Sequence, residues 1–106
     1  MTGKTCHTAW AKIFIAGPID VAKHTCRKFC LAEGLCVTVD PTTYIYTGGE
    51  EAGVVVGLIN YPKFESSELH TFRKACKLAH VLLKEMAQRS VTVQGNYQTI
   101  WITNEE

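Results

Sequence analysis

AGVVVGLINY, residues 52–61, is the stretch that decides the fold. Val54, Val56 and Leu58 point one way along an extended chain, and Val55 and Ile59 point the other way. A strand with one face in water alternates apolar with polar residues, and this stretch does not. We therefore expect a strand that is covered on both sides.

The chain before this strand reads as a strand, a helix and a further extended region. KIFIA, residues 12–16, is rich in β-forming residues and stops at Gly17-Pro18. Residues 21–33 place apolar side chains at helical spacing, with Asp20 as the expected N-cap and Gly34 as the residue that ends the helix.

A hairpin is expected between this helix and the central strand. Residues 35–39 favour a strand that Asp40-Pro41 interrupts, because Pro41 has no amide proton and marks an edge, a bend or a bulge. Residues 42–47 resume with strong β propensity. Gly48-Gly49 then favours a turn, because glycine tolerates positive φ.

A second helix and a final β segment follow the central strand. Ser66 or Ser67 is the expected cap of a helix that runs to about Arg89. Its apolar positions are spaced by three and four residues: Leu69, Phe72, Cys76, Ala79, Leu83 and Met86. Residues 91–103 predict a last strand or hairpin around Gly95-Asn96.

The element order β-α-β-β-α-β predicts an α+β fold of the ferredoxin-like type. This fold is a sandwich in which two helices cover one face of a four-stranded antiparallel sheet. We expect residues 1–106 to form a single domain, in which residues 1–11 could be a loose N-terminal arm.

Composition excludes several classes of protein. Hydrophobic residues make up 46% of the 106 residues and charged residues 20%, which is typical of a globular chain. No apolar run approaches the roughly 20 residues that span a bilayer, and the first ten residues lack a signal-peptide pattern. We expect a cytoplasmic protein, in which five cysteines stay reduced and fill the core.

The sheet face opposite the helices is the first candidate functional surface. We expect a second copy of the chain, in a homodimer, to cover it. The alternative is that residues 1–11 or 41–47 fold across it. The side chains expected at this interface are Phe14, Val55, Ile59, Tyr61 and Trp101.

The helices form the second candidate surface. Residues 20–33 and 66–89 hold eight basic and four acidic side chains, whereas the rest of the chain holds three and six. A basic face can bind the phosphates of a nucleic acid, although solvated lysines on a helix are also common. The basic candidates are Lys23, Arg27, Arg73, Lys77 and Lys84.

Three short stretches resemble known families. KIFI, residues 12–15, resembles the first strand of RNA-recognition motifs, which stack bases on aromatic residues of strands one and three. KIFIAGP, residues 12–18, is similar to the opening of nucleoside deoxyribosyltransferase-like proteins, where the glycine-proline turn helps to hold a nucleotide. YIYTGGEEAGVVVGLINYPKF, residues 44–64, resembles small uncharacterised phage and mobile-element proteins, which implies an accessory or interaction role.

Our main functional hypothesis is a non-enzymatic interaction module that pairs with itself and with an unknown protein or nucleic acid, and not with a membrane. We expect no catalytic residue, cofactor or metal, since the chain has no CxxC pair and three of its cysteines lie on apolar stripes. One alternative is nucleic-acid binding through the basic helices. The other is a small-molecule-binding or catalytic dimer with a pocket lined by Tyr44, Tyr46 and Trp101.

Overall fold

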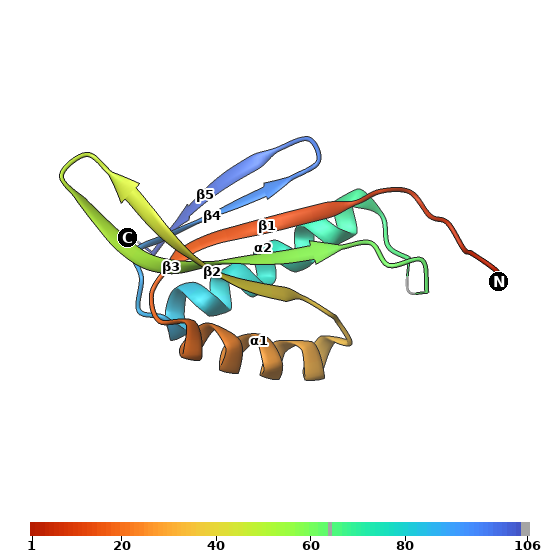
Figure 1. Ribbon diagram of the computed structural model, residues 1–106, viewed down its shortest axis with the longest axis horizontal. Helices are drawn as coiled ribbons and strands as arrows, with labels where there is room; N and C mark the ends of the chain where they lie inside the picture. Colours follow the sequence, from red (N-terminus) through yellow and green to blue (C-terminus); the bar gives the residue numbers. More distant parts are fainter. Residues whose placement is uncertain (64, 105–106) are drawn as a thin grey trace.

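The computed structural model describes residues 1–63 and 65–104. The elements are β1 (Trp10–Ala16), α1 (Ile19–Glu33), β2 (Thr38–Tyr46), β3 (Gly49–Ile59), α2 (Glu68–Glu85), β4 (Ser90–Gly95) and β5 (Thr99–Thr103). The strands form one antiparallel sheet in the order β2-β3-β1-β4-β5 (Figure 1).

The predicted α+β class is confirmed, and the predicted number of strands is wrong. The sheet has five strands instead of four, because residues 90–103 form a complete hairpin. Its turn is Asn96-Tyr97, closed by a hydrogen bond of 2.8 Å from the Gly95 amide to the Gln98 carbonyl. This turn is short enough to let both flanking segments pair.

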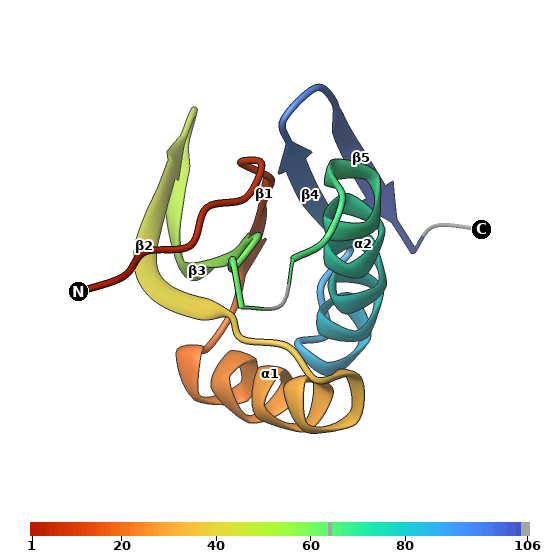
Figure 2. The same ribbon diagram turned by 90° about the vertical axis from the view of Figure 1, so that its right-hand side faces the viewer.

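Both helices pack on the same side of the sheet (Figure 2). The side chains of residues 52–61 point alternately to the two faces of the sheet, as expected, and those on the helix side are buried: Val54 and Val56 are fully buried, as are Ile13 and Ile15 on β1. Leu78 and Leu82 of α2 complete the centre of this core. Side chains of the other parity therefore lie on the open face of the sheet.

The helix ends differ from the prediction at two points. Asp20 is not the N-cap of α1, because Pro18 takes that position. Asp20 lies in the first turn, where its negative charge interacts favourably with the positive end of the helix dipole. Ser67 caps α2 by accepting a hydrogen bond of 3.0 Å from the His70 amide. α2 ends at Glu85 instead of near Arg89.

β2 is a single strand that passes through Asp40-Pro41 without a break. It is the outermost strand beside β3, where the missing amide proton of Pro41 removes no hydrogen bond that the sheet needs. The sequence allowed an edge, a bend or a bulge at Pro41, and the structure shows an edge strand.

The residues before β1 are held at one end of the sheet. Ala9 is 1% exposed, and the Asn60 amide donates to its carbonyl at 2.7 Å. The Asn60 side chain donates to the His7 carbonyl at 2.8 Å. This segment runs on beyond the end of β1 and leaves the open sheet face uncovered (Figure 1).

Over the described residues, neither helix has the length and apolar character that a membrane crossing needs.

Candidate functional site

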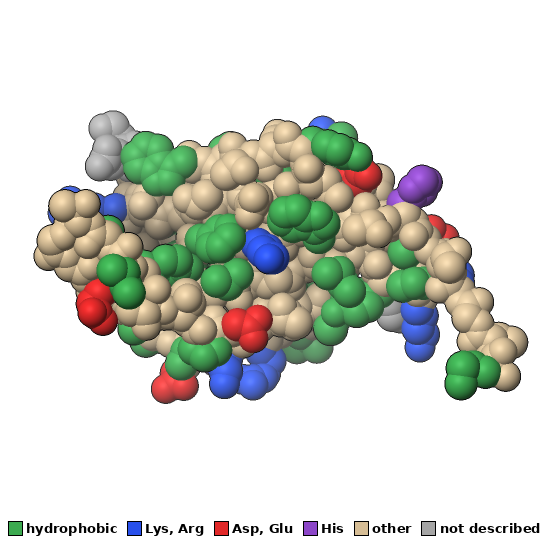
Figure 3. All heavy atoms as spheres, turned by 45° about the horizontal axis from the view of Figure 1, so that its top comes forward, with side chains coloured by type: hydrophobic (Ala, Val, Ile, Leu, Met, Phe, Trp, Pro, Cys, Tyr) green, Lys and Arg blue, Asp and Glu red, His purple; other side chains and the backbone are tan. Residues whose placement is uncertain are grey.

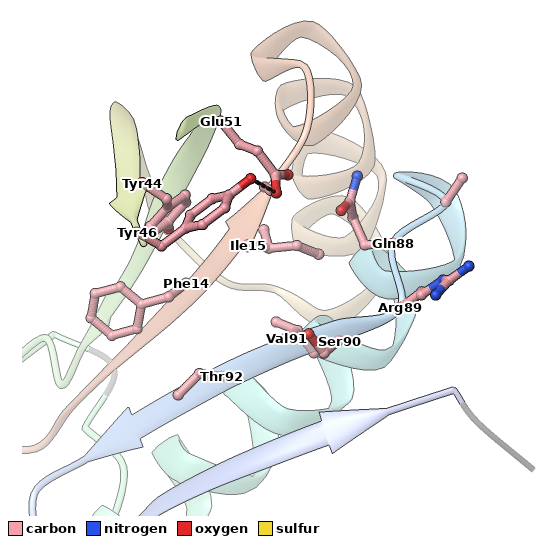
Figure 4. Close-up of a pocket in the computed structure, with 12 residues that line it drawn as sticks. Phe14, Ile15, Tyr44, Tyr46, Glu51, Gln88, Arg89, Ser90, Val91 and Thr92 are labelled. Carbon is pink, nitrogen blue, oxygen red and sulfur yellow. Dashed lines mark hydrogen bonds between the residues drawn. The ribbon is translucent and has the colours of Figure 1, made fainter. Parts of the chain in front are cut away.

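A hollow of about 740 Å³ opens on the uncovered side of the sheet, between the β2–β3 hairpin and the segment that joins α2 to β4 (Figure 4). We call it the hairpin pocket. Its volume falls in the usual range for small-molecule sites. Its lining residues are Phe14, Ile15, Ala16, Tyr44, Tyr46, Glu51, Ala87, Gln88, Arg89, Ser90, Val91 and Thr92.

Three aromatic rings form one wall of the hairpin pocket. Tyr44 and Tyr46 are two residues apart on β2 and therefore share a face, and Phe14 lies on the same face of β1. The Tyr44 ring can lie across β3 only because residue 53 is glycine: a Cβ there would come within 2.5 Å of Tyr44 Cε2. Gly53 thus shapes this wall by its missing side chain.

The tyrosine hydroxyls are held in place by hydrogen bonds. Tyr46 donates to Glu51 Oε1 at 3.0 Å, and this bond raises the pKa of Tyr46. Tyr44 donates to the Val54 carbonyl, and burial raises the pKa of its hydroxyl. Both phenols are therefore neutral at ordinary pH, and the carboxylate of Glu51 is fixed at the rim of the pocket (Figure 4).

The opposite wall comes from the turn after α2. Ala87 has a φ of 53°, and its amide and that of Gln88 donate to the Lys84 and Leu83 carbonyls at 3.1 and 3.0 Å. These two bonds close the helix in the pattern that normally carries glycine at the position of Ala87. The left-handed residue turns the chain sharply and brings Gln88 to the wall that faces Glu51, whereas the side chain of Arg89, which also lines the pocket, points away from Glu51 (Figure 4).

The predicted pocket residues are partly brought together. Tyr44 and Tyr46 line the hairpin pocket, whereas Trp101 lies on β5 and does not. Glu51 is not among the residues that the sequence singles out. The cross-strand pairing of Tyr44 with Glu51 is the signal that could have found it, because opposed residues share a face of the sheet.

The predicted interface residues lie mainly on the open face. Val55 pairs with Phe14 in the register of β3 and β1, and Thr92 of β4 separates Phe14 from Trp101. Ile59 is 55% exposed. Tyr61 follows β3 and lies beside Cys36, and a hydrogen bond between the two side chains raises the pKa of Tyr61. That a second chain covers this face stays a prediction.

The predicted basic residues lie on the other side of the molecule from the hairpin pocket. Lys23 and Arg27 are exposed on α1, and Arg73, Lys77 and Lys84 are exposed on α2.

The two helices are joined by an ion-paired carboxylate. Lys77 and Lys74 donate to Glu33 Oε1 at 2.8 and 3.1 Å, and these bonds lower the pKa of Glu33. Nucleic-acid binding by this layer stays a prediction.

The cysteines are free thiols in different surroundings. Cys26 is 3% exposed, and burial raises its pKa to about 11, as expected for core filler. Cys36 is exposed. Within residues 1–63 and 65–104, no group of three or more His, Cys, Asp or Glu side chains is placed to hold a metal ion.

Two solved structures share this fold. One is a phage SAM lyase in its apo state, with a TM-score of 0.77 and 22% identity over 92% of this chain and 90% of that one. The other is a phage SAM lyase in complex with S-methyl-5'-thioadenosine, with a TM-score of 0.72 and 20% identity over 99% and 96% of the two chains. No family model and no curated protein matches this sequence.

These structures contradict the prediction of a non-enzymatic interaction module, because both are structures of a lyase. The faint resemblance of residues 44–64 to small phage proteins is confirmed at the level of fold.

Proposed function

We propose that this protein is a lyase that cleaves S-adenosylmethionine (SAM), and that the hairpin pocket holds the substrate. The observation that carries the proposal is the meeting of an aromatic wall and a fixed carboxylate in one hollow. The similarity in fold to a phage SAM lyase, over 92% of this chain, supports the same assignment.

The pocket suits the chemistry of an adenosyl sulfonium. Aromatic faces attract cations, and they also stack on planar rings such as adenine. Phe14, Tyr44 and Tyr46 offer such faces within one wall. The carboxylate of Glu51 lies beside them and can attract either positive charge of the substrate, the sulfonium or the ammonium group.

Formation of S-methyl-5'-thioadenosine from SAM breaks the bond between the sulfonium sulfur and Cγ of the amino-acid chain. In the reaction we propose, the substrate's own carboxylate oxygen attacks Cγ, and the electron pair of the C–S bond moves to sulfur. The products are the neutral thioether and a five-membered homoserine lactone, so that every atom of SAM is retained. No water, metal or added base takes part in this step.

The step joins an anion to a cation and removes both charges. Water slows such a step because it stabilises the charged reactant by solvation. A pocket with a largely aromatic wall stabilises the separated charges less, so the barrier to the step is lower there. The pocket must also bend the substrate so that the carboxylate oxygen lies about 3 Å from Cγ. We assign this bending to Glu51, which Tyr46 orients, acting on the substrate's ammonium group.

The test is incubation of the purified protein with SAM, followed by chromatography and mass spectrometry of the products. The native chain should release S-methyl-5'-thioadenosine together with homoserine lactone. Glu51→Gln should lower kcat/KM by roughly 10²-fold, as expected when a fixed charge is removed from a site. The matched control is Glu50→Gln, because Glu50 adjoins Glu51 on β3 but does not line the pocket.

Each outcome separates the proposal from its rivals. Native protein that is folded and yields no S-methyl-5'-thioadenosine would overturn the proposed function. Detection of an unsaturated amino acid instead of the lactone would show that the reaction proceeds by loss of a Cβ proton and not by attack of the substrate's carboxylate. Equal losses in Glu51→Gln and Glu50→Gln would place the chemistry outside the hairpin pocket.

We also infer that the first four strands form a ferredoxin-like sandwich to which β5 has been added. Supporting this, β2, β3, β1 and β4 are neighbours in that order and both helices lie on one side of them. β5 is then an extra strand at the edge beyond β4.

A further inference from the structure

The two edges of the sheet differ in how well they are protected against pairing. β2 carries Asp40 and Pro41, and charge and proline are two of the devices by which proteins block an edge strand. β5 reads TIWIT and contains neither. In this strand Trp101 is 67% exposed and Ile100 is 42% exposed. An apolar edge without such protection invites another strand.

The hydrogen bonds around β5 show which of its backbone groups face outward. The Gln98 carbonyl accepts from Gly95, and the Asn104 amide donates to the Arg89 carbonyl at 3.0 Å. Hydrogen-bonded pairs alternate along antiparallel strands, so the backbone groups of Ile100 and Ile102 also point toward β4. Those of Thr99, Trp101 and Thr103 therefore point away from β4, and no strand among the described residues pairs with them.

The sequence of β5 is the same in both directions: Thr-Ile-Trp-Ile-Thr. We propose that a second copy of this chain pairs antiparallel along β5, with a two-fold axis at Trp101. In this register Thr99 lies opposite Thr103 of the second copy, and the two Trp101 residues lie opposite each other. All three opposed pairs consist of residues whose backbone groups point outward, so each pair exchanges both N–H···O bonds.

The side chains fit this register on both faces of the joined sheet. On the open face, the two Trp101 rings become cross-strand neighbours, a kind of pair that stabilises antiparallel sheets. On the helix side, the exposed Ile100 meets Ile102 of the second copy, which covers apolar surface that one chain leaves in water. Figure 3 shows that hydrophobic side chains are spread over the sheet face that the helices leave open.

The proposal is independent of the proposed lyase function. Residues that line the hairpin pocket come from β1, β2, β3, β4 and the turn before β4, and none comes from β5. A change on the outer edge of β5 can therefore alter the assembly without altering a pocket residue. Product formation and assembly are measured separately and can fail separately.

The first test is sedimentation of the full chain over a series of concentrations, with Thr103→Pro compared with Thr103→Val. The native chain should reach twice the mass of 11.8 kDa. Proline at 103 removes an outward amide proton and spares the hydrogen bonds to β4, so it should raise the dimer dissociation constant about tenfold or more. Valine keeps the amide proton and should dimerise as the native chain does.

The second test fixes the register. The double variant Thr99→Cys/Thr103→Cys should form a disulfide between chains on oxidation by an added disulfide reagent, because residues opposed in a hydrogen-bonded pair are about 5.5 Å apart. Either single variant should not link through its new cysteine, since Thr99 of one chain lies about 13 Å along the strand from Thr99 of the other. Peptide mapping distinguishes this link from links through the native cysteines.

Three results would overturn the proposal. The first is a native chain that stays monomeric at every concentration. The second is an oligomer whose dissociation constant is the same for Thr103→Pro and Thr103→Val, with circular dichroism showing both to be folded. The third is an oligomer in which Thr99→Cys/Thr103→Cys forms no link between residues 99 and 103.

Discussion

Replacing Gly53 by alanine should damage both the fold and the hairpin pocket. A Cβ at residue 53 would lie 2.5 Å from Tyr44 Cε2, 2.6 Å from the Ile15 carbonyl oxygen and 2.9 Å from Ala16 Cα. The tyrosine ring can move, but the two backbone contacts belong to β1, which pairs with β3 at this point. Relief of all three contacts requires β1 and β3 to separate.

The expected cost follows from this geometry. Overpacking of a well-packed site costs about 1–3 kcal/mol, and the two backbone contacts place Gly53→Ala near the middle of that range, at about 2 kcal/mol. For a chain of this size, that corresponds to a fall in Tm of roughly 10 °C. Because Tyr44 must leave its place on β3, binding of S-methyl-5'-thioadenosine should weaken as well.

Gly57→Ala is the matched control for this prediction. Gly57 lies on the same strand and face, and a Cβ there would meet Thr38 Oγ1 at 2.6 Å. That atom is the end of an exposed side chain that can rotate, so the cost should stay below about 1 kcal/mol. Urea unfolding followed by tryptophan fluorescence measures both variants. Equal losses of stability in the two would refute the argument from close contacts.

Three further predictions concern other parts of the molecule. Ala87→Gly should raise the free energy of unfolding by about 0.5–1 kcal/mol, because glycine adopts positive φ without strain; thermal unfolding measures this, and a loss would contradict it. The stability difference between the native chain and Tyr46→Phe should be present below pH 10 and vanish as the pH rises through the raised pKa of Tyr46, since only the neutral phenol donates to Glu51; a difference that persists at higher pH would argue against this bond. Alkylation followed by mass spectrometry should modify Cys36 first and Cys26 last, because Cys26 is buried and its pKa is about 11; the opposite order would contradict the packing of α1.

Local pattern was enough to predict which side chains of β3 face the helices, but only part of the buried face of α2: Leu69 of the predicted stripe is 51% exposed, and Leu78, which the stripe omits, is fully buried. The parity of Val54 and Val56 against Val55 separated the helix side of β3 from the open face, and the structure has the same division. A hydroxyl before an apolar helical run predicts a cap, which narrowed the start of α2 to Ser66 or Ser67, and the structure shows Ser67 as the cap.

The remaining features depend on contacts between distant residues. Residues 90–103 form a segment too short for periodicity to distinguish one strand from a hairpin, so the sequence does not decide whether β5 exists. The end of α2 depends on the left-handed Ala87, a conformation that an alanine does not signal. Glu51 gains its role only from its cross-strand position opposite Tyr44. The pocket therefore could not be assembled from the sequence, although both of its tyrosines, Tyr44 and Tyr46, were named.

A crystal structure of this protein soaked with S-methyl-5'-thioadenosine tests the central claim most directly. The account predicts electron density for the nucleoside in the hairpin pocket, in contact with Tyr44 or Tyr46 and next to the carboxylate of Glu51. Density for the nucleoside at a different place on the chain, with the hairpin pocket empty in the same crystal, would contradict it.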